Sequence, residues 1–414
     1  MKKLSQLNLQ DYENLLIDYL DELGTIGDGE FGLWRRPFTP EYEEGANLVA
    51  GWMEKHGLKV KKDGIGNLIG RLEGTGSNPR VFAMGSHLDT VKGGGKYDGM
   101  LGVIGGILAV DYMLKTYGQP QHTIEVIAFI GEEGSRYSGL MGSKWMAGEF
   151  NEADLNQKDE NGISLREAAA SCGYDLSSLL SAPRHDIEAF LELHIEQGPV
   201  LEAKGCPIGI VSTITGIKQA EFTVCGRSDH AGTTPLAMRQ DALLAATKII
   251  GAMDHLVRQS GGDTVFTVGN IEVSPGAVNI VTSKAVFTID MRDPDPAKLN
   301  NLYNQLQQVA EKEAANAKVK VTRKDILAVE PVPCNGELRK VLAGAAGELG
   351  FEYQEMVSGA GHDALLVSHF AKVGMLFVPS IGGRSHCRDE FTPAGQCLAG
   401  MAVLAESMRR LAYK

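Results

Sequence analysis

Metal-binding residue types follow an apolar run in the first quarter of the chain. The run 81–86 leads into His87 and Asp89, and Asp98 follows after a glycine-rich loop. If this run is a strand of an open α/β sheet, its carboxyl end lies at the crevice where such sheets bind ligands. His87 and Asp98 are then candidate metal ligands, and Asp89 is a candidate carboxylate that holds the His87 ring.

Two adjacent carboxylates, Glu132 and Glu133, come directly after a second apolar run, 123–130. Exposed glutamate pairs are usually only solvated, but this pair leaves the predicted sheet on the edge where His87 is expected. In such a position one carboxylate can bind a metal ion while its neighbour transfers protons. The pair therefore adds a candidate ligand and a candidate general base.

Two further histidines stand at predicted strand ends. His194 lies in the run 190–195, and His386 follows the run 373–378. His194 alone is equally consistent with a buried core histidine, but four strand ends with ligand-type residues are unlikely to coincide by chance. Three histidines and two carboxylates suit a dinuclear site of nitrogen and oxygen donors, most naturally zinc. The six cysteines form no CxxC pair, which argues against a closed structural zinc site.

The elements that position these residues follow from hydrophobic periodicity. Their alternation predicts an α/β sheet with helices on both faces. The acidic, serine-rich stretch 151–184 is expected to leave this pattern, with one helix near 165–172. In the first half of the chain the predicted helices are 9–24, 42–56 and 102–117, and the predicted strands are 58–62, 67–72, 81–86, 123–130, 190–195 and 208–211.

From residue 216 the predicted order changes to β-α-β-β-α-β, which is a complete small domain. We expect this unit to be an insertion, 213–329, within a domain made of 1–212 and 330–414. Its predicted strands are 219–225, 264–273, 284–292 and 318–323, and its helices are 238–258 and 297–317. The sheet-and-helix pattern resumes with 337–349, 373–378 and 392–411.

Composition limits the function classes. The chain has 414 residues, 43% hydrophobic and 22% charged, with a net charge of −12. These values predict a folded globular protein of two or more domains. An acidic protein has no general attraction for nucleic acid or anionic membranes. No membrane span or leader sequence is predicted, so we expect a cytoplasmic enzyme with a small-molecule substrate.

A series of ordered motifs resembles a known family. The chain is similar to the dinuclear zinc amidohydrolases of the aminoacylase and carboxypeptidase superfamily, in the branch of N-carbamoyl-L-amino-acid hydrolase, β-ureidopropionase and allantoate amidohydrolase. The resemblance implies a mixed-sheet, zinc-exopeptidase-like catalytic domain with an inserted ferredoxin-like domain for dimerisation or as a lid. The motifs are GSHLDTV (85–91), YDGMLGV (97–103), GEEGSRY (131–137), ELHIEQGPVLE (192–202), HAGTTP (230–235), VNIV (278–281), SGAGHDA (358–364) and SH (385–386).

The resemblance also implies the metal centre. It implies two divalent ions per subunit, zinc first, with manganese, cobalt or nickel as alternatives. Asp98 would bridge the ions and Glu132 would be the general base. The other implied ligands are His87 and His194 on the first ion, and Glu133 and His386 on the second.

Substrate contacts and assembly are implied in the same way. Arg292 would bind the substrate carboxylate, and His230 and Asn279 would stabilise the oxyanion. The inserted domain would form a homodimer. Further implied contacts are Gln197 and the backbone of Gly359, Ala360 and Gly361.

The substrate class that we expect is ureido carboxylates, first N-carbamoyl-L-amino acids. Relatives that cleave peptides or N-acyl amino acids usually carry a carboxylate where this chain has His194. Allantoate hydrolysis remains the main alternative, followed by a dipeptidase or N-acyl amino acid hydrolase. A non-catalytic binding protein is disfavoured because every implied ligand is present. Cys387, Arg388 and Arg384 depart from the family pattern around His386.

Overall fold

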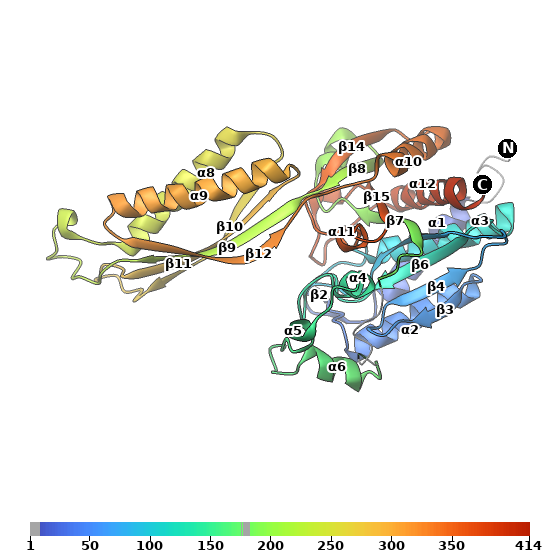
Figure 1. The fold of residues 1–414 in the computed structure, drawn as a ribbon, viewed down its shortest axis with the longest axis horizontal. Coiled ribbons are helices and arrows are strands. Elements are labelled where there is room, and N and C mark those ends of the chain that lie inside the picture. The colour runs from blue at the N-terminus through green and yellow to red at the C-terminus, as the bar shows by residue number, and fades with distance from the viewer. Residues whose placement is uncertain (1–8, 175, 177–182) are drawn as a thin grey trace. The chain divides into compact units, whose positions relative to one another are not determined.

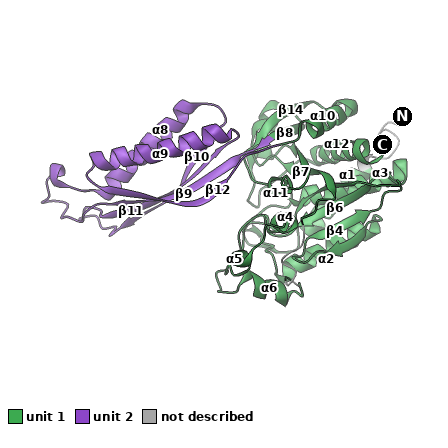
Figure 2. Ribbon diagram, viewed as in Figure 1, with its two compact units in different colours: residues 1–212, 334–414 green, residues 213–333 purple. Residues whose placement is uncertain are grey.

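The chain forms two compact units in the computed structural model, which describes residues 9–174, 176 and 183–414 (Figure 1). One unit consists of residues 1–212 and 334–414, and the other of residues 213–333 (Figure 2). The second unit is thus an insertion in the first. Residues 1–8 and part of the predicted excursion 151–184 lie outside the described residues.

The larger sheet is mixed, has the order β13-β8-β15-β7-β5-β6-β4-β3 with β14 paired to β8, and belongs to unit 1 except for β13 and the last two residues of β8. The four strands β15, β7, β5 and β6 are parallel neighbours, and β3, β4, β8 and β13 are antiparallel to their partners. The parallel strands are β5 (Val81–His87), β6 (Thr123–Phe129), β7 (Ile187–Ile195) and β15 (Lys372–Val378). The others are β3 (Lys59–Lys62), β4 (Leu68–Leu72), β8 (Ile208–Ile214), β13 (Val332–Pro333) and β14 (Tyr353–Ser358).

Helices cover this sheet, and every residue of β5 and β6 is buried. Continuous burial of this kind is typical of parallel strands that are covered on both faces. The helices of unit 1 are α1 (Leu9–Leu23), α2 (Pro40–Lys55), α3 (Met100–Tyr117), α4 (Met141–Met146), α5 (Glu152–Leu155), α6 (Leu165–Ser171), α7 (Val200–Lys204), α10 (Gly336–Leu349), α11 (Ala364–Val367) and α12 (Ala394–Ala412).

Helix α3 connects β5 to β6 and packs against β5, β7, α1 and α12. By length and composition alone it is apolar enough to cross a membrane, but 78% of it is buried inside the protein. Its apolar composition is therefore explained by its burial in the core of unit 1.

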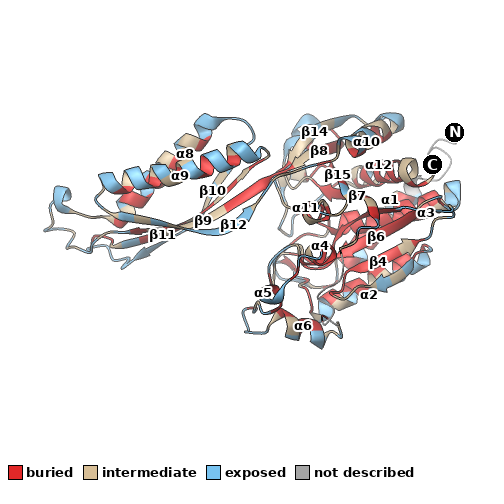
Figure 3. Ribbon diagram, viewed as in Figure 1, coloured by how far each residue is buried: buried red, intermediate tan, exposed pale blue. Residues whose placement is uncertain are grey.

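Unit 2 contains a four-stranded antiparallel sheet of order β10-β11-β9-β12. Helices α8 and α9 pack on it around a core in which the rings of Phe222 and Phe287 stack with centroids 5.3 Å apart. Much of β10 and β12 is exposed (Figure 3). The elements are β9 (Gly216–Cys225), η3 (Leu236–Met238), α8 (Ala242–Ser260), β10 (Val265–Ser274), β11 (Lys284–Asp293), α9 (Pro296–Asn316) and β12 (Lys320–Val329).

The sequence prediction missed several short elements. Among them are α4, α7, α11, β14, the turn η4 (Ile381–Gly383) and a hairpin of β1 (Asp28–Gly29) and β2 (Gly32–Leu33). The shortest of these segments cannot show a hydrophobic period, and β14 has no continuous apolar run. They form because of contacts with distant residues, as where Leu33 pairs with Gly94.

Candidate metal centre

The four parallel strands bring the predicted ligands to one edge of the sheet. His87 ends β5 opposite Phe129 of β6, and His194 on β7 lies opposite Phe377 of β15. Because the strands run in the same direction, the loops that carry Asp98, Glu133 and His386 start from this same edge. The expectation that these strand ends lie together is confirmed.

His87, Asp98 and His194 form a buried group whose ligand atoms lie within 4.8 Å of one another. The Nδ1 atom of His87 is 3.0 Å from the Asp89 carbonyl oxygen, and that of His194 is 2.9 Å from the Ile195 carbonyl oxygen. Each Nδ1 therefore donates a proton, which leaves a lone pair on Nε2.

Both Nε2 atoms lie close to the same carboxylate oxygen. Asp98 Oδ1 is 3.3 Å from His87 Nε2 and 3.1 Å from His194 Nε2. Asp98 Oδ1 is buried without a hydrogen-bond donor. Three electron-pair donors that converge in a buried space are suited to a bound cation. The residues present thus fit the metal that the sequence predicts.

A second group shares Asp98. His386 Nε2 is 3.5 Å from Asp98 Oδ2 and 3.4 Å from Glu133 Oε2, and these three residues could also hold a metal ion. Asp98 therefore offers one oxygen to each group. This is the arrangement that a bridging ligand requires.

Asp89 acts on this site in a different way from the one predicted. Its carboxylate is 3.9 Å from His87 Nδ1, and the close contact to that nitrogen comes from the Asp89 main-chain carbonyl. The carboxylate instead accepts hydrogen bonds from the backbone N–H groups of Gly131, Glu132 and Glu133, at 2.9 to 3.1 Å. Asp89 thus holds both the His87 ring and the turn that carries the glutamates.

Glu132 lies beside this group, with Oε2 3.8 Å from His87 Nε2. Burial raises the pKa of the Glu132 carboxyl well above its usual range, and the charge of Glu133 adds to this effect. Burial also raises the pKa of Glu133, with Asp98 as the next cause. For Asp98, burial acts in the same direction, but His194 and His87 in their protonated forms hold its pKa well below the usual range. A cation bound among these carboxyl groups would favour their charged forms.

Comparison with known proteins places the chain in a family. The sequence matches peptidase family M20/M25/M40 over residues 83–410. The chain belongs to this family.

Relatives match this M20 chain along almost its entire length. N-carbamoyl-L-amino acid amidohydrolase of Geobacillus stearothermophilus is 38% identical over 397 residues, which cover 95% of this chain and 97% of that protein. Allantoate amidohydrolase of Bacillus subtilis (strain 168) is 37% identical over 415 residues, which cover 100% and 99%. A solved amidase of the hydantoinase/carbamoylase family from Burkholderia multivorans has a TM-score of 0.90 and 31% identity, covering 97% and 98%. The M20 family is metal-dependent, and the chain is a hydrolase of that family.

Three side chains beside Asp98 hold it in place in this M20 chain. The Oδ2 atom of Asp98 accepts from Gln197 Nε2 and lies near Ser385 Oγ, each at 2.7 Å. Glu390 binds the Asp98 backbone. Gln197 was predicted as a substrate contact, whereas Glu390 was not predicted. No local pattern distinguishes Glu390 from other acidic residues, because its partners are distant in the sequence.

Gly99, the residue after Asp98, must be a glycine. Its φ of +70° is in the left-handed region, and a Cβ atom there would lie 2.5 Å from the His87 ring. The backbone N–H of Gly99 donates to His194 Nε2 at 3.2 Å. The first turn of α3 can therefore lie directly against both histidines only because this position has no side chain.

The other predicted substrate residues lie in two places. In unit 2, His230 and Asn279 are on adjacent segments, joined where the Ala231 N–H donates to the Asn279 carbonyl at 3.0 Å. Arg292 on β11 forms a two-pronged ion pair with Asp290, at 2.8 and 3.0 Å. In unit 1, the loop 359–361 joins β14 to α11. It is followed by His362, whose ring lies 4.5 Å from that of His194.

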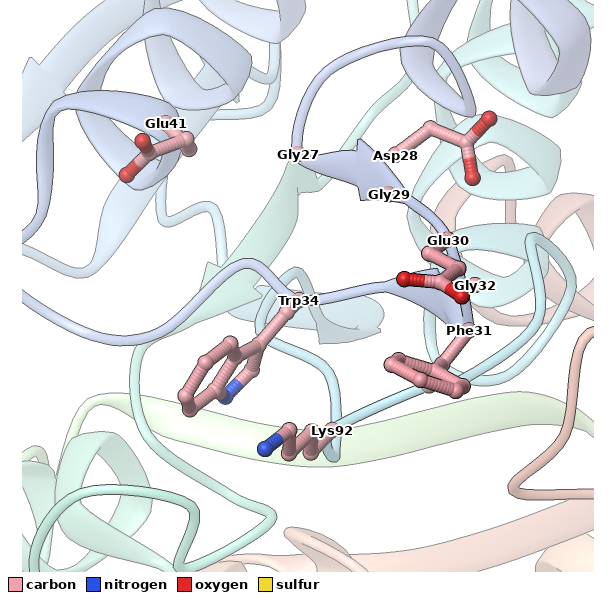
Figure 4. Close-up of a pocket in the computed structure, with 10 residues that line it drawn as sticks. Gly27, Asp28, Gly29, Glu30, Phe31, Gly32, Trp34, Glu41 and Lys92 are labelled. Carbon is pink, nitrogen blue, oxygen red and sulfur yellow. The ribbon is translucent and has the colours of Figure 1, made fainter.

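A cavity of about 560 Å³ lies beside the β1–β2 hairpin in unit 1 (Figure 4). Phe31, Trp34, Glu41 and Lys92 contribute to its wall, and it contains none of the predicted metal ligands. Arg388 attaches the hairpin to the loop of His386, because its guanidinium donates to the carbonyls of residues 29 and 30 at 3.1 Å. Arg388, which departs from the family pattern, thus makes a structural contact.

Proposed function

We propose that the chain hydrolyses the carbamoyl amide bond of N-carbamoyl-L-amino acids, giving the amino acid, carbon dioxide and ammonia. The observation that carries this proposal is the position of Asp98, whose two oxygens face two separate groups of ligand-type side chains. A dinuclear centre of this kind suits the attack of water on an amide carbonyl.

The residues that would hold two divalent ions are those of the two groups. His87, Asp98 and His194 would hold one ion, and Asp98, Glu133 and His386 the other. Zinc is the first choice because all donors are imidazole nitrogens or carboxylate oxygens. When bound, such a pair polarises the carbonyl and lowers the pKa of a water molecule to about 7.

Glu132 would transfer the proton. The Glu132 carboxylate lies beside the group of His87, Asp98 and His194. The Glu132 backbone is fixed because it belongs to the turn held by Asp89. The carboxylate would accept a proton from the attacking water and deliver it to the departing amine nitrogen. The carbamate that remains then decomposes to carbon dioxide and ammonia.

Arg292 would bind the α-carboxylate of the substrate through two parallel hydrogen bonds. Its ion pair with Asp290 orients the guanidinium plane, and Gln219 holds Asp290 through a hydrogen bond of 2.7 Å. His230 and Asn279 would stabilise the oxyanion, and the backbone of Gly359, Ala360 and Gly361 would contact the substrate.

Unit 2 would be a ferredoxin-like dimerisation domain. Its β-α-β-β-α-β order and its exposed edge strands support this proposal. The complete assembly would then be a homodimer.

Allantoate hydrolysis is the second candidate, because the Bacillus subtilis allantoate amidohydrolase is similar over the whole chain. One panel of substrates separates the candidates. Each substrate is assayed for release of ammonia or free amine, and the panel contains N-carbamoyl-L-amino acids, N-carbamoyl-β-alanine, allantoate, N-acetyl amino acids and dipeptides. We expect N-carbamoyl-L-amino acids to have the highest kcat/KM. A higher value for allantoate selects the second candidate, and dipeptides above every ureido compound contradict both.

A further inference from the structure

Glu390 joins the two loops that carry the metal-ligand residues Asp98 and His386. Its Oε1 atom accepts hydrogen bonds from the backbone N–H groups of Tyr97 and Asp98, at 2.9 and 3.0 Å. Its Oε2 atom accepts one from the Ser385 hydroxyl at 2.8 Å. One buried carboxylate thus contacts the residue before His386 and the backbone of Asp98 itself.

The loop of residues 379–392 is held at both ends, so Glu390 has a defined position. The Thr392 hydroxyl donates to the Pro379 carbonyl at 2.8 Å, and the Ile381 N–H donates to the Phe391 carbonyl at 2.9 Å. Glu390 itself is only 5% exposed. Its carboxylate is therefore fixed with respect to the end of β15.

The loop before Asp98 packs directly on this carboxylate. A Cβ atom at Gly95 would lie 2.3 Å from Glu390 Oε1 and 2.4 Å from Glu390 Cβ. Real Cβ atoms do not approach other atoms so closely. Because Gly95 has no side chain, the backbone at residues 97 and 98 can come close enough to Glu390 to form hydrogen bonds with it.

We propose that Glu390 is a positioning residue that holds Asp98 between the two metal-ligand groups. The inference depends on the dinuclear centre of the proposed function. Without Glu390, the two N–H groups lose their acceptor and Ser385 loses one of its two carboxylate partners. Asp98 then moves relative to His386, although no ligand has been removed. Loss of a residue that orients a ligand typically weakens metal binding by about 10- to 100-fold.

The test measures metal affinity directly. Apoprotein is titrated with Zn²⁺ in competition with a chromophoric chelator, for the unchanged chain and for Glu390→Ala, Glu390→Gln and Asp389→Asn. Asp389 is the matched control, because it is an exposed carboxylate in the same loop that pairs with Arg384. We expect Glu390→Ala to weaken binding of at least one ion by about 10- to 100-fold. Glu390→Gln keeps an acceptor oxygen and should lose less than tenfold, and Asp389→Asn should leave binding unchanged.

Gly95→Ala gives an independent test that leaves every polar group in place. Its added methyl should displace the Glu390 contact and weaken metal binding in the same direction. Equal affinities in Glu390→Ala and Asp389→Asn would overturn the proposal, as would a loss of apoprotein thermal stability without a loss of affinity. An unchanged chain that binds fewer than two ions would overturn both this inference and the dinuclear centre. One that binds two ions but hydrolyses no ureido compound would overturn only the proposed function.

Discussion

The sheets of the two units differ in how their functional residues are supported. In unit 1 the ligand-type residues stand at the ends of parallel strands that are buried on both faces, and His87 and His194 are each 1% exposed. In unit 2 the sheet is antiparallel, and His230 and Asn279 are exposed. Chemistry that needs fixed geometry is thus expected in unit 1, and recognition in unit 2.

This difference predicts how mutations behave. In unit 1, a change at one ligand disturbs several others, because Asp98 alone contacts His87, His194, Gln197 and His386. In unit 2, exposed residues can change without affecting the core around Phe222. We therefore expect large, cooperative losses of function from unit 1 and smaller, separable ones from unit 2.

Metal removal should have the largest effect. Chelation of the protein is expected to abolish hydrolysis of ureido substrates, because both proposed ion sites lie at the sheet edge of unit 1. Added Zn²⁺ should restore activity. Elemental analysis of active protein should give two metal ions per chain, and a value of one or none would contradict the dinuclear centre.

Glu132→Gln should reduce turnover by about two to three orders of magnitude, as expected for a lost general base. Metal content should remain the same, because Glu132 is not a predicted ligand. Glu133→Gln is the matched comparison, since the neighbouring residue is a predicted ligand and its loss should lower metal content. Near-normal turnover of Glu132→Gln would remove this residue from its role.

Arg292→Ala tests recognition in unit 2. A charge-assisted contact with a carboxylate contributes about 1.5 to 3 kcal/mol. The variant should therefore lose about 10- to 100-fold in kcat/KM for carboxylate substrates, at about 1.4 kcal/mol per factor of ten. Arg258→Ala is the control, because Arg258 is an exposed arginine of unit 2 that pairs with Asp254 one turn earlier. Equal kinetics of the two variants would argue against a carboxylate contact.

Assembly gives a further test of unit 2. We expect a dimer by sedimentation at micromolar concentration. Ile271 on β10 and Ile326 on β12 are exposed apolar residues of the two edge strands, with 44% and 55% exposure. If an edge forms the interface, Ile271→Lys or Ile326→Lys should shift the protein toward the monomer. A monomeric unchanged chain would contradict the assembly.

The smallest effect is expected at Arg388, which contacts the hairpin but no ligand. Arg388→Ala should increase the rate of limited proteolysis within residues 27–34, because two hydrogen bonds to hairpin carbonyls are lost. Metal content should stay the same. Arg384→Ala should leave the rate unchanged, since Arg384 pairs with Asp389 in its own loop. Equal proteolysis of the two variants would mean that Arg388 does not retain the hairpin.

Much of the centre could be predicted from sequence because its ligands follow long strands. The apolar run before His87 and the run before Glu132 have a clear pattern, and parallel pairing then brings their ends together. Residues defined by long-range contacts could not be predicted. Glu390 contacts Asp98 across almost three hundred residues, and the turn that Asp89 holds depends on backbone N–H groups with no sequence signature.

The position of α3 affects how unit 1 can be synthesised. This helix is nearly all apolar, and one of its main partners, α12, begins only at Ala394. At about 5 to 20 residues per second, translation from the end of α3 to α12 takes on the order of tens of seconds. During that time α3 has no α12 to cover it, and an uncovered apolar helix is prone to aggregation. Chaperones that bind nascent chains would therefore be expected to favour this segment, and production of the protein should depend on their supply.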